Sequence, residues 1–265
     1  MNEIIRHDIF GDRDMVDIAI ERIRKHEPED GYWLAFSGGK DSIVLKDLAA
    51  KAGVKFESHY NVTTIDPPDL LVYIKHNHPD VIWDYPDEHF LKALVRKGFP
   101  LRQARWCCDL YKERGGTGRT VLTGIRHQES SNRSHRKIYE QDYKDNTKWF
   151  CHPIIDWDDS EIWEYIHNHK LPYCKLYDEG WKRIGCILCP FQSVESKTKE
   201  IEKYPNMVRG FRNAFRKLYR KGRNEGRAWS SRWANGDEMF EWWVYKRDEN
   251  SRKDELQMEL YEEGK

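Results

Sequence analysis

The sequence predicts an α/β fold with a parallel central sheet and a C-terminal helical extension. Up to residue 190, short apolar segments that suit buried strands alternate with longer segments of helical periodicity. A glycine-rich turn follows the first of these strands and opens a helix, as in parallel sheets that bind ligands. Beyond residue 190 no strand pattern is found. We therefore assign 1–190 to the α/β core and 191–265 to a helical extension that is first basic and then acidic.

Each element follows from its own pattern. Val16, Ile20 and Ile23 recur at helical spacing, so 13–26 is expected to be a helix. The apolar run at 32–36 is too short for a helix and suits a buried strand. The other expected elements are a helix from Lys40 or Asp41 to Ala52, strands at 56–62, 81–83 and 120–125, helices after Pro68 and at 87–97, and a helix from Ser160, its capping residue, to His169.

The composition excludes several classes of protein. With 265 residues, 13% aromatic residues and 45 basic against 45 acidic side chains, the chain is expected to be globular rather than disordered. No apolar segment approaches the roughly 18 residues of a membrane span, and the N-terminal residues lack the pattern of a signal peptide. The 6 cysteines are far too few for a disulfide scaffold, so we expect a reducing, cytoplasmic location.

The zero net charge hides an uneven distribution. Residues 196–233 contain twelve Lys or Arg and three acidic residues, whereas 236–265 contain ten acidic residues and five basic ones. A basic segment attracts phosphate, so nucleic acid is a candidate partner of 196–233. A solvated helix face is the alternative. The aromatic residues available for base stacking, or alternatively for packing on the core, are Phe211, Phe215, Tyr219, Trp229 and Trp233.

The strongest chemical motif is the glycine turn, which has the sequence SGGKDS. Its residues are Ser37, Gly38, Gly39, Lys40, Asp41 and Ser42. Two glycines let the backbone approach an anion closely, and N–H groups at the start of the following helix bind phosphate oxygens. The serine hydroxyl groups and the lysine charge add donors. A turn that uses glycine only for its geometry is the alternative.

Two cysteine pairs form a second constellation. Cys107 and Cys108 are adjacent, and Cys186 and Cys189 form a CxxC motif. Four thiolates suit zinc or an iron–sulfur cluster. A redox disulfide and buried thiols that act as small apolar residues are the alternatives. The other two cysteines have no nearby partner in the sequence and are expected to be such buried residues.

The SGGKDS turn matches SGGxDS, the pyrophosphate-binding loop of the adenine-nucleotide alpha-hydrolase superfamily. The chain therefore resembles this superfamily, whose members are also called PP-loop ATP pyrophosphatases. Further blocks resemble the phosphoadenosine-phosphosulfate (PAPS) reductase family in that superfamily. In order they are WCCDLYK at 106–112, GIRHQES at 124–130, PIIDW at 153–157 and GCILCP at 185–190. The resemblance covers roughly residues 30–190 and implies a Rossmann-like core.

The resemblance also implies site residues. The substrate-binding GxRxxES segment corresponds to Gly124, Arg126 and Glu129, with Arg133 close behind. Guanidinium groups suit phosphate or sulfate oxygens, and a surface ion pair is the alternative for both arginines. The four paired cysteines would ligate a 4Fe-4S cluster, and Lys112 would lie near it as a positive charge or else in solvent. Catalytic roles are expected for Lys40, Asp41 and Arg126.

Two departures from the reductases direct the functional prediction. Sulfonucleotide reductases use a cysteine near their C-terminus as nucleophile, whereas this sequence has no cysteine after Cys189. Reductases usually carry a degenerate glycine loop, because their nucleotide lacks a β–γ pyrophosphate, whereas this loop is complete. The resemblance therefore implies an iron–sulfur ATP pyrophosphatase, similar to DNA-phosphorothioation and RNA-thiolation enzymes, that uses ATP and Mg²⁺ to form an adenylate for sulfur transfer.

Two other functions stay open. One is an assimilatory adenylylsulfate or phosphoadenylylsulfate reductase that releases sulfite, with its nucleophile supplied by Cys151, Cys174 or a partner. The other is a nucleotide-binding iron–sulfur scaffold in a modification or defence complex. The expected partners are an adenine nucleotide, a sulfur donor such as a cysteine desulfurase, nucleic acid and further copies of the chain. No membrane association is expected.

Overall fold

The computed structural model describes residues 4–8 and 11–246, which form two compact units. The first unit comprises the described residues up to Val62, Pro68–Asp84 and Arg114–Ile184. The second comprises Thr63–Pro67, Tyr85–Glu113 and the chain from Gly185 onward. The division predicted at residue 190 differs from this grouping, since it places 63–67 and 85–113 in the core. The acidic segment 247–265 lies outside the described residues.

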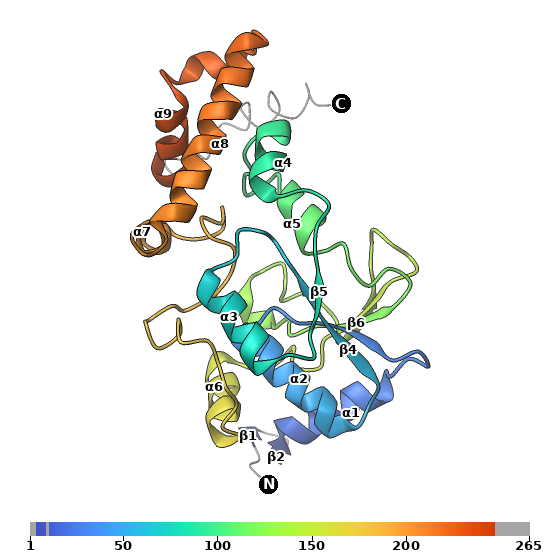
Figure 1. The fold of residues 1–265 in the computed structure, drawn as a ribbon. Coiled ribbons are helices and arrows are strands. Elements are labelled where there is room, and N and C mark those ends of the chain that lie inside the picture. The colour runs from blue at the N-terminus through green and yellow to red at the C-terminus, as the bar shows by residue number, and fades with distance from the viewer. Residues whose placement is uncertain (1–3, 9–10, 247–265) are drawn as a thin grey trace. The chain divides into compact units, whose positions relative to one another are not determined.

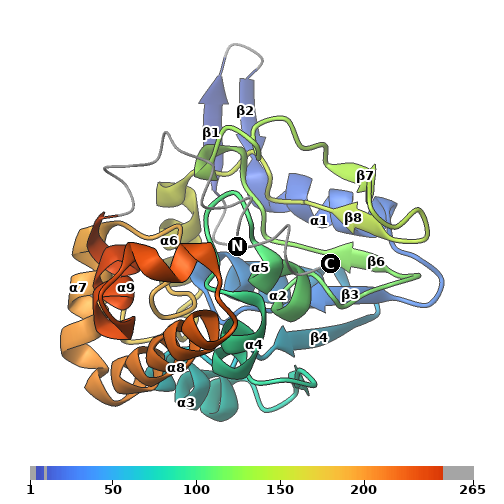
Figure 2. The same cartoon turned by 90° about the horizontal axis from the view of Figure 1, so that it is seen from above.

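The first unit is built on a six-stranded sheet with the strand order β5-β4-β3-β6-β8-β7. Figure 2 shows β4, β3, β6 and β8 side by side in that order. All neighbouring strands are parallel except β7, which pairs antiparallel with β8. The strands are β3 (Tyr32–Ala35), β4 (Phe56–Asn61), β5 (Ile82–Asp84), β6 (Thr120–Leu122), β7 (Tyr139–Gln141) and β8 (Trp149–Cys151). The predicted α/β class with a mainly parallel sheet is confirmed.

The helices of the first unit bury apolar residues against this sheet. They are α1 (Met15–Lys25), α2 (Lys40–Ala52), α3 (Pro68–Asn77) and α6 (Asp159–Asn168), with a short 3-10 turn η1 (His127–Glu129). One core cluster joins Leu34 of β3 to Val44 of α2, Ile74 of α3 and Ile166 of α6, and none of these four is exposed. Long apolar residues at helical spacing thus anchor the helices, as their periodicity predicts.

Three local features of the first unit differ from the predictions. Asp158, and not Ser160, caps α6: its carboxylate accepts the N–H of Glu161 over 2.9 Å, and Glu161 returns the contact to the N–H of Asp158. The hairpin of β1 (Ile5–Asp8) and β2 (Gly11–Asp14) was not expected, because its second strand is polar and exposed. Strands β7 and β8 have three residues each, which is too short for a periodic signal.

The second unit is helical. Its elements are α4 (Phe90–Lys97), α5 (Trp106–Tyr111), α7 (Val194–Lys203), α8 (Pro205–Asn224), η2 (Ala228–Arg232), α9 (Gly236–Glu241) and the π-helical turn η3 (Trp242–Lys246). Phe90 of α4 packs against Phe211 of α8 with ring centroids 5.8 Å apart, and the indole N–H of Trp243 donates to the carbonyl of Pro100. These contacts explain why 85–113 groups with the helical extension. Within the described residues, no helix has the length and apolar character needed to cross a membrane.

Candidate nucleotide and thiol sites

The glycine turn lies where the order of the parallel strands reverses. After β3 the chain forms β4 on one side of it, and later forms β6 on the other side. Open α/β sheets bind ligands beyond the carboxyl ends of their strands at such a switch point. Residues 36–39 connect the end of β3 to the first turn of α2, which starts at Lys40 as predicted.

Gly38 determines the shape of the turn. Its φ of +70° is left-handed, and a Cβ at this position would lie 2.7 Å from the side chain of Ile74. Both the conformation and the space therefore require glycine. Gly39 has an ordinary φ of −80° and caps α2 without a side-chain hydrogen bond. Among the described residues no acceptor pairs with the N–H of Gly38, so this donor is available to an anion.

The two serines of the turn bond to the turn itself. Ser37 Oγ donates to Ser42 Oγ over 3.2 Å and accepts the N–H of Gly39 over 3.3 Å. Ser42 Oγ in turn donates to the carbonyl of Gly39 over 2.8 Å. In this arrangement the serines order the backbone around the glycines, and the donors that remain for a ligand are main-chain N–H groups.

Two buried cations and two carboxylates form a closed network beside the turn. Arg126 Nε donates to Asp41 Oδ1 over 2.7 Å, and its Nη2 donates to Asp159 Oδ1 over 2.8 Å. Lys40 Nζ lies 2.9 Å from the same oxygen of Asp159 and 3.3 Å from Asp41 Oδ2. The side chains of Lys40 and Arg126 are 9% and 3% exposed, whereas that of Asp159 is 54% exposed. The three predicted catalytic residues therefore meet, together with one carboxylate that the motifs did not point to.

The network fixes the charges of its members. Burial alone would raise the pKa of Asp159, but Lys40 and then Arg126 lower it below its usual value. Burial alone would lower the pKa of Arg126, and the negative charges of Asp41 and Asp159 raise it instead. Asp159 and Arg126 are thus both ionised at neutral pH. The carboxylates of Asp41 and Asp159 balance the positive charges of Lys40 and Arg126, and an anionic ligand would have to compete with them.

Two more residues shape the surroundings of the turn. The hydroxyl of Tyr177 accepts the N–H of Lys40 over 3.0 Å, and burial raises its pKa so that it stays a neutral phenol. This N–H at the start of α2 is a donor that a phosphate oxygen would otherwise use. Gly124 lies against Asp41: a Cβ on Gly124 would be 3.0 Å from the Asp41 carbonyl oxygen. The close approach explains the glycine at the start of the predicted substrate segment.

The remaining predicted nucleotide-binding residues pair with each other. Glu129 accepts the backbone N–H of Arg126 over 2.9 Å, and Arg133 forms an ion pair with Glu129 four residues earlier. In the part of the chain that the structure describes, the ion pair of Arg133 is made with Glu129 and not with the glycine turn. Glu129 thus orients the backbone of Arg126, and Arg133 contacts Glu129 through their ion pair.

The second unit brings the four paired cysteines together. Cys107 and Cys108 lie in the first turn of α5, and Cys186 and Cys189 lie in the loop before α7. All four are free thiols of intermediate exposure. Cys107 interacts electrostatically with the other three, so the CC pair and the CxxC pair belong to one thiol site.

Burial and the charge of Lys112 act in opposite directions on the pKa values of thiols in this site. A hydrogen bond from Cys107, together with the positive charge of Lys112, lowers the pKa of Cys108 to about 6. Burial raises the pKa of Cys186 to about 11, and Lys112 opposes that rise. The Cys186 thiolate in turn raises the pKa of Lys112 above its ordinary value. Four sulfur donors beside one cation have the chemistry of iron–sulfur ligands, although the described residues do not bring three such groups close enough to hold a metal ion.

The CxxC loop is held from α7 by residues that the motifs did not indicate. Glu200 is fully buried, and its two carboxylate oxygens accept the N–H of Leu188 and the side-chain amide of Gln192, each over 2.5 Å. The other end of the Gln192 amide accepts the N–H of Cys189 over 3.0 Å. Leu188 has a left-handed φ of 56°, which is rare for leucine, and Glu200 holds this strained peptide in place.

The other cysteines are core residues, as predicted. Cys151 and Cys174 are 0% exposed and belong to the apolar cluster of the first unit. Burial raises the pKa of Cys151 to about 12, so this thiol stays protonated. Both therefore act as small apolar side chains.

Comparison with known proteins identifies the family. Residues 31–192 match the family model described as the phosphoadenosine phosphosulfate reductase domain. Because this match covers more than half of the chain, the protein belongs to the phosphoadenosine phosphosulfate reductase family. The predicted resemblance is confirmed, and the matched range contains the glycine turn, Arg126 and all four paired cysteines.

Several curated proteins are similar to the chain. An uncharacterized protein of Methanocaldococcus jannaschii is 29% identical over 209 residues, which are 74% of this chain and 43% of the relative. An adenosine 5'-phosphosulfate reductase of Bacillus anthracis is 32% identical over 48% of this chain and 47% of its own length. A protein of the same name from Geobacillus thermodenitrificans is 28% identical over 66% of this chain and 78% of its length. The chain spans less than half the length of the first two relatives.

A solved structure shares the fold. The phosphoadenylyl-sulfate reductase of Candida auris superposes with a TM-score of 0.50, and the superposition covers 63% of this chain and 87% of that one. The sequences are 19% identical, so this likeness concerns the fold alone.

Proposed function

We propose that the protein is an ATP pyrophosphatase that forms an adenylate for sulfur transfer and holds a 4Fe-4S cluster. The observation that carries this proposal is the pair of buried cations, Lys40 and Arg126, at a complete glycine turn. Two positive charges and main-chain donors suit a nucleotide whose negative charge extends beyond the α-phosphate. The β–γ pyrophosphate of ATP has that charge, whereas adenylylsulfate lacks it.

In the proposed reaction an oxygen of the acceptor forms a bond to the α-phosphorus of ATP. The bond from this phosphorus to the bridging oxygen breaks, and pyrophosphate leaves with the electron pair. Gly38 N–H, Lys40 and Arg126 stabilise the charge that builds on the leaving group. A sulfur nucleophile from a donor such as a cysteine desulfurase later displaces AMP from the acceptor.

Asp41 fits a role at the metal of the nucleotide. Its carboxylate lies at the turn, is 23% exposed and offers the hard oxygen ligands that Mg²⁺ prefers. A bound Mg²⁺ supplies further positive charge to the phosphates. Asp41 also accepts the Arg126 Nε–H, and this bond fixes the plane of the guanidinium.

Cys107, Cys108, Cys186 and Cys189 would hold the cluster. A bound cluster supplies redox-active iron and sulfide to the second unit. The protein's own part is to place the positive charge of Lys112 beside the ligands and to keep the CxxC loop in one conformation, through Glu200 and Gln192. A purely structural cluster is compatible with the same contacts.

Reduction of a sulfonucleotide is the second candidate function. The relatives from Bacillus anthracis and Geobacillus thermodenitrificans carry the name adenosine 5'-phosphosulfate reductase, which favours this reading. Both thiols outside the paired set are buried in the core, so a reductase would need its nucleophile from elsewhere.

One experiment separates the two functions. Anaerobically purified protein is incubated with ATP and Mg²⁺, and in parallel with adenylylsulfate or phosphoadenylylsulfate plus a thiol. We expect pyrophosphate and AMP from ATP, and loss of both products in Arg126→Gln. Sulfite from a sulfonucleotide, without ATP turnover, would replace the proposal with the reductase. The exposed Arg24→Gln serves as control for the loss of one arginine.

A further inference from the structure

Helix α8 concentrates positive charge in the second unit. It carries seven Lys or Arg residues and no acidic residue. Two of the seven are neutralised by α9, which lies alongside α8 in Figure 1. Arg216 Nε donates to Asp237 over 2.8 Å, and Arg212 pairs with Asp237 and Glu241. This part of the charge therefore holds α8 and α9 together.

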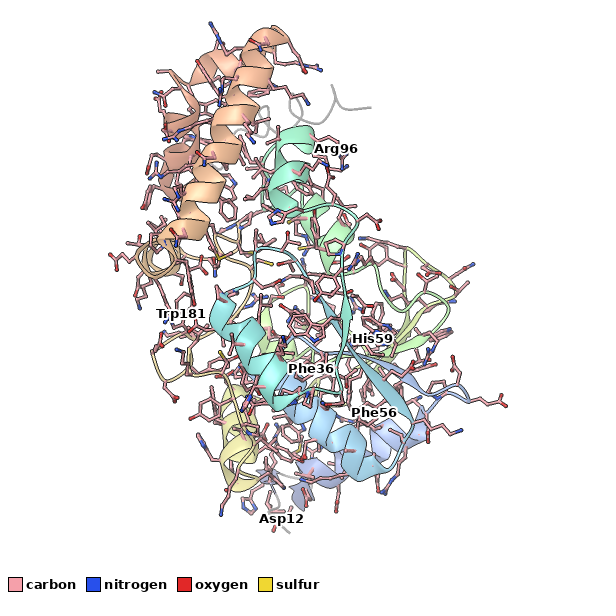
Figure 3. All side chains as sticks on the ribbon, viewed as in Figure 1. Asp12, Phe36, Phe56, His59, Arg96 and Trp181 are labelled. Atoms are coloured by element: carbon pink, nitrogen blue, oxygen red, sulfur yellow. The ribbon has the colours of Figure 1, made fainter. Side chains whose placement is uncertain are left out.

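The C-terminal half of α8 presents most of the other five cations. Lys217, Arg220 and Lys221 recur at i, i+3 and i+4 and so share one helix face. Lys217 and Arg220 are exposed, and Lys221 Nζ lies 3.5 Å from the carbonyl of Arg96, a residue labelled on α4 in Figure 3. Within residues 4–8 and 11–246, no carboxylate forms an ion pair with any of the three. We call these three residues and Asn224 the α8 basic face.

The α8 basic face borders an open hollow. Its four residues line the hollow together with Glu225, whose carboxylate is paired with Arg227 over 3.1 Å. The three lysine and arginine side chains therefore dominate the charge of this surface. Three cations on one helix face, without an ion pair in the part of the chain that the structure describes, suit a partner with closely spaced negative charges.

The side chains around this face argue against two kinds of partner. The aromatic residues Phe211, Phe215, Trp229 and Trp233 are at most 6% exposed, so they pack the unit and offer no stacking platform for a single strand. The packing interpretation is thus right for these four. In addition, no large apolar side chain is exposed on α8, whereas a membrane-binding helix needs an apolar face.

We propose that the α8 basic face binds the phosphate backbone of duplex DNA. Lys and Arg neutralise phosphates and release counterions, and an α-helix fits the major groove of B-DNA. Duplex RNA is a poorer fit because its major groove is deep and narrow. The binding concerns the second unit alone, needs no nucleotide, and goes beyond the proposed ATP chemistry.

The test measures binding of fluorescently labelled duplex DNA by the full-length protein at several salt concentrations, without ATP. The triple variant Lys217→Gln, Arg220→Gln, Lys221→Gln is compared with the wild type. Each phosphate contact contributes about 0.9 to the slope of log affinity against log salt, so three lost contacts reduce the slope by about 2.7. The charge-matched control Lys25→Gln, Lys75→Gln, Lys137→Gln removes three exposed lysines of the first unit and keeps the wild-type slope.

Three outcomes would overturn the proposal. The slope of the triple variant equals that of the wild type, or the control variant loses as much slope, which would indicate non-specific attraction. Alternatively, single-stranded RNA or anionic lipid vesicles compete with the labelled duplex better than unlabelled duplex DNA does. Thermal unfolding checks each variant, and because the substituted side chains lie at the surface, we expect unchanged midpoints. Pyrophosphate release from ATP, measured on the same variant, reports separately on the proposed function.

Discussion

Arg126 Nε and Asp41 Oδ1 lie 2.7 Å apart, although the two residues are 85 positions apart in the sequence. The contact joins the segment after β6 to the first turn of α2, and Gly124 permits it by having no side chain against the Asp41 carbonyl. The pair therefore links the glycine turn to the predicted substrate segment 124–130. Lys40 and Asp159 close the network on its exposed side.

Removal of each carboxylate of this network is expected to have a different effect: loss of the Asp159 charge strengthens pyrophosphate binding, whereas loss of the Asp41 charge slows ATP turnover. Asp159 is the more exposed one and competes with phosphate for Lys40 and Arg126, so Asp159→Asn should bind pyrophosphate about two- to fivefold more tightly, as for a partly exposed ion pair. Asp41→Ala removes one negative charge as well, but also removes the oxygen that accepts the Arg126 Nε–H and orients the guanidinium. Turnover of ATP should fall on the order of 10²–10³-fold in that variant. Calorimetric titration with pyrophosphate and a pyrophosphate-release assay check both, and equal effects of the two substitutions would contradict the assignment.

Substitution of Gly39 is expected to block nucleotide binding without unfolding the protein. Its φ of −80° suits any residue, and an added Cβ meets Ser37 Oγ at 3.3 Å, a tight but adjustable contact. The side chain would nonetheless occupy space that phosphates approach. Gly39→Ala should weaken ATP binding slightly, and Gly39→Val at least tenfold, or about 1.4 kcal/mol. Equilibrium binding of ATP across this series, with thermal midpoints as control, measures the effect. Unchanged ATP affinity in Gly39→Val would show that the glycine turn does not bind the phosphates.

The thiol site should bind iron. Protein purified anaerobically is expected to be brown and to contain about four iron atoms per chain. Cys107→Ser and Cys186→Ser should lose the visible absorbance, because each removes one of the four ligands. Cys174→Ser makes the same chemical change in the core of the first unit and should retain it. Metal analysis decides the matter: colourless protein with one zinc per chain would replace the cluster by a zinc site.

Glu200 should control how firmly the CxxC loop holds its metal. Glutamine at this position offers only one acceptor, so either the N–H of Leu188 or the amide of Gln192 loses its partner, at a cost of about 1–3 kcal/mol. Glu200→Gln should therefore release iron to a chelator faster than the wild type. Glu202→Gln changes an exposed residue of the same helix and should release iron at the wild-type rate. Equal rates of iron release in the two variants would show that Glu200 does not control how firmly the CxxC loop holds iron.

His78 should make the protein sensitive to acid. Tyr73 donates to the carbonyl of Pro172, so His78 Nε2 donates to the Tyr73 oxygen and Nδ1 faces Lys46 Nζ at 3.5 Å. Burial, and then the charge of Lys46, lowers the pKa of His78 to about 4 from an ordinary value near 6.5. The unfolded chain therefore binds this proton first, and stability is lost as the pH falls from about 6.5 towards 4.

The loss that His78 causes at pH 4.5 should be about 2–3 kcal/mol relative to pH 7. Urea unfolding at the two pH values measures it. His78→Gln should show a correspondingly smaller difference, whereas His76→Gln, at an exposed position in the last turn of α3, should behave like the wild type. A difference of the same size in all three proteins would assign the acid sensitivity to other groups.

The parts of the site that are local in the sequence could be predicted from it. A strand, a glycine turn and a helix in succession define residues 37–42, and the position of Arg126 after a strand indicates a ligand-binding edge. Asp159 was not recognised, because acidic residues before a helix usually act as caps, as Asp158 does here. Tyr177 lies in an irregular segment without periodicity, so only the folded chain shows that its hydroxyl reaches the N–H of Lys40.

The grouping of α4 and α5 with the C-terminal helices cannot be predicted from the sequence pattern either. The apolar residues of α4 have helical spacing, which predicts a helix but not the surface that covers it. Phe90 could equally pack on a sheet or on another helix, and its contact with Phe211 is long-range. Burial of Glu200 is a similar case, since a glutamate in a polar helix is expected at the surface.

The interleaving of the two units has a consequence for how the protein is made. On the ribosome, Cys107, Cys108 and the apolar side of α4 emerge long before Cys186, Cys189 and α8, the segments with which they share the second unit. During that interval half of the thiols and the ring of Phe90 lack their native neighbours. Assembly of the thiol site therefore belongs to a late stage of biosynthesis, after α7 and α8 have left the exit tunnel, and the nascent chain is most vulnerable to oxidation and aggregation before that point.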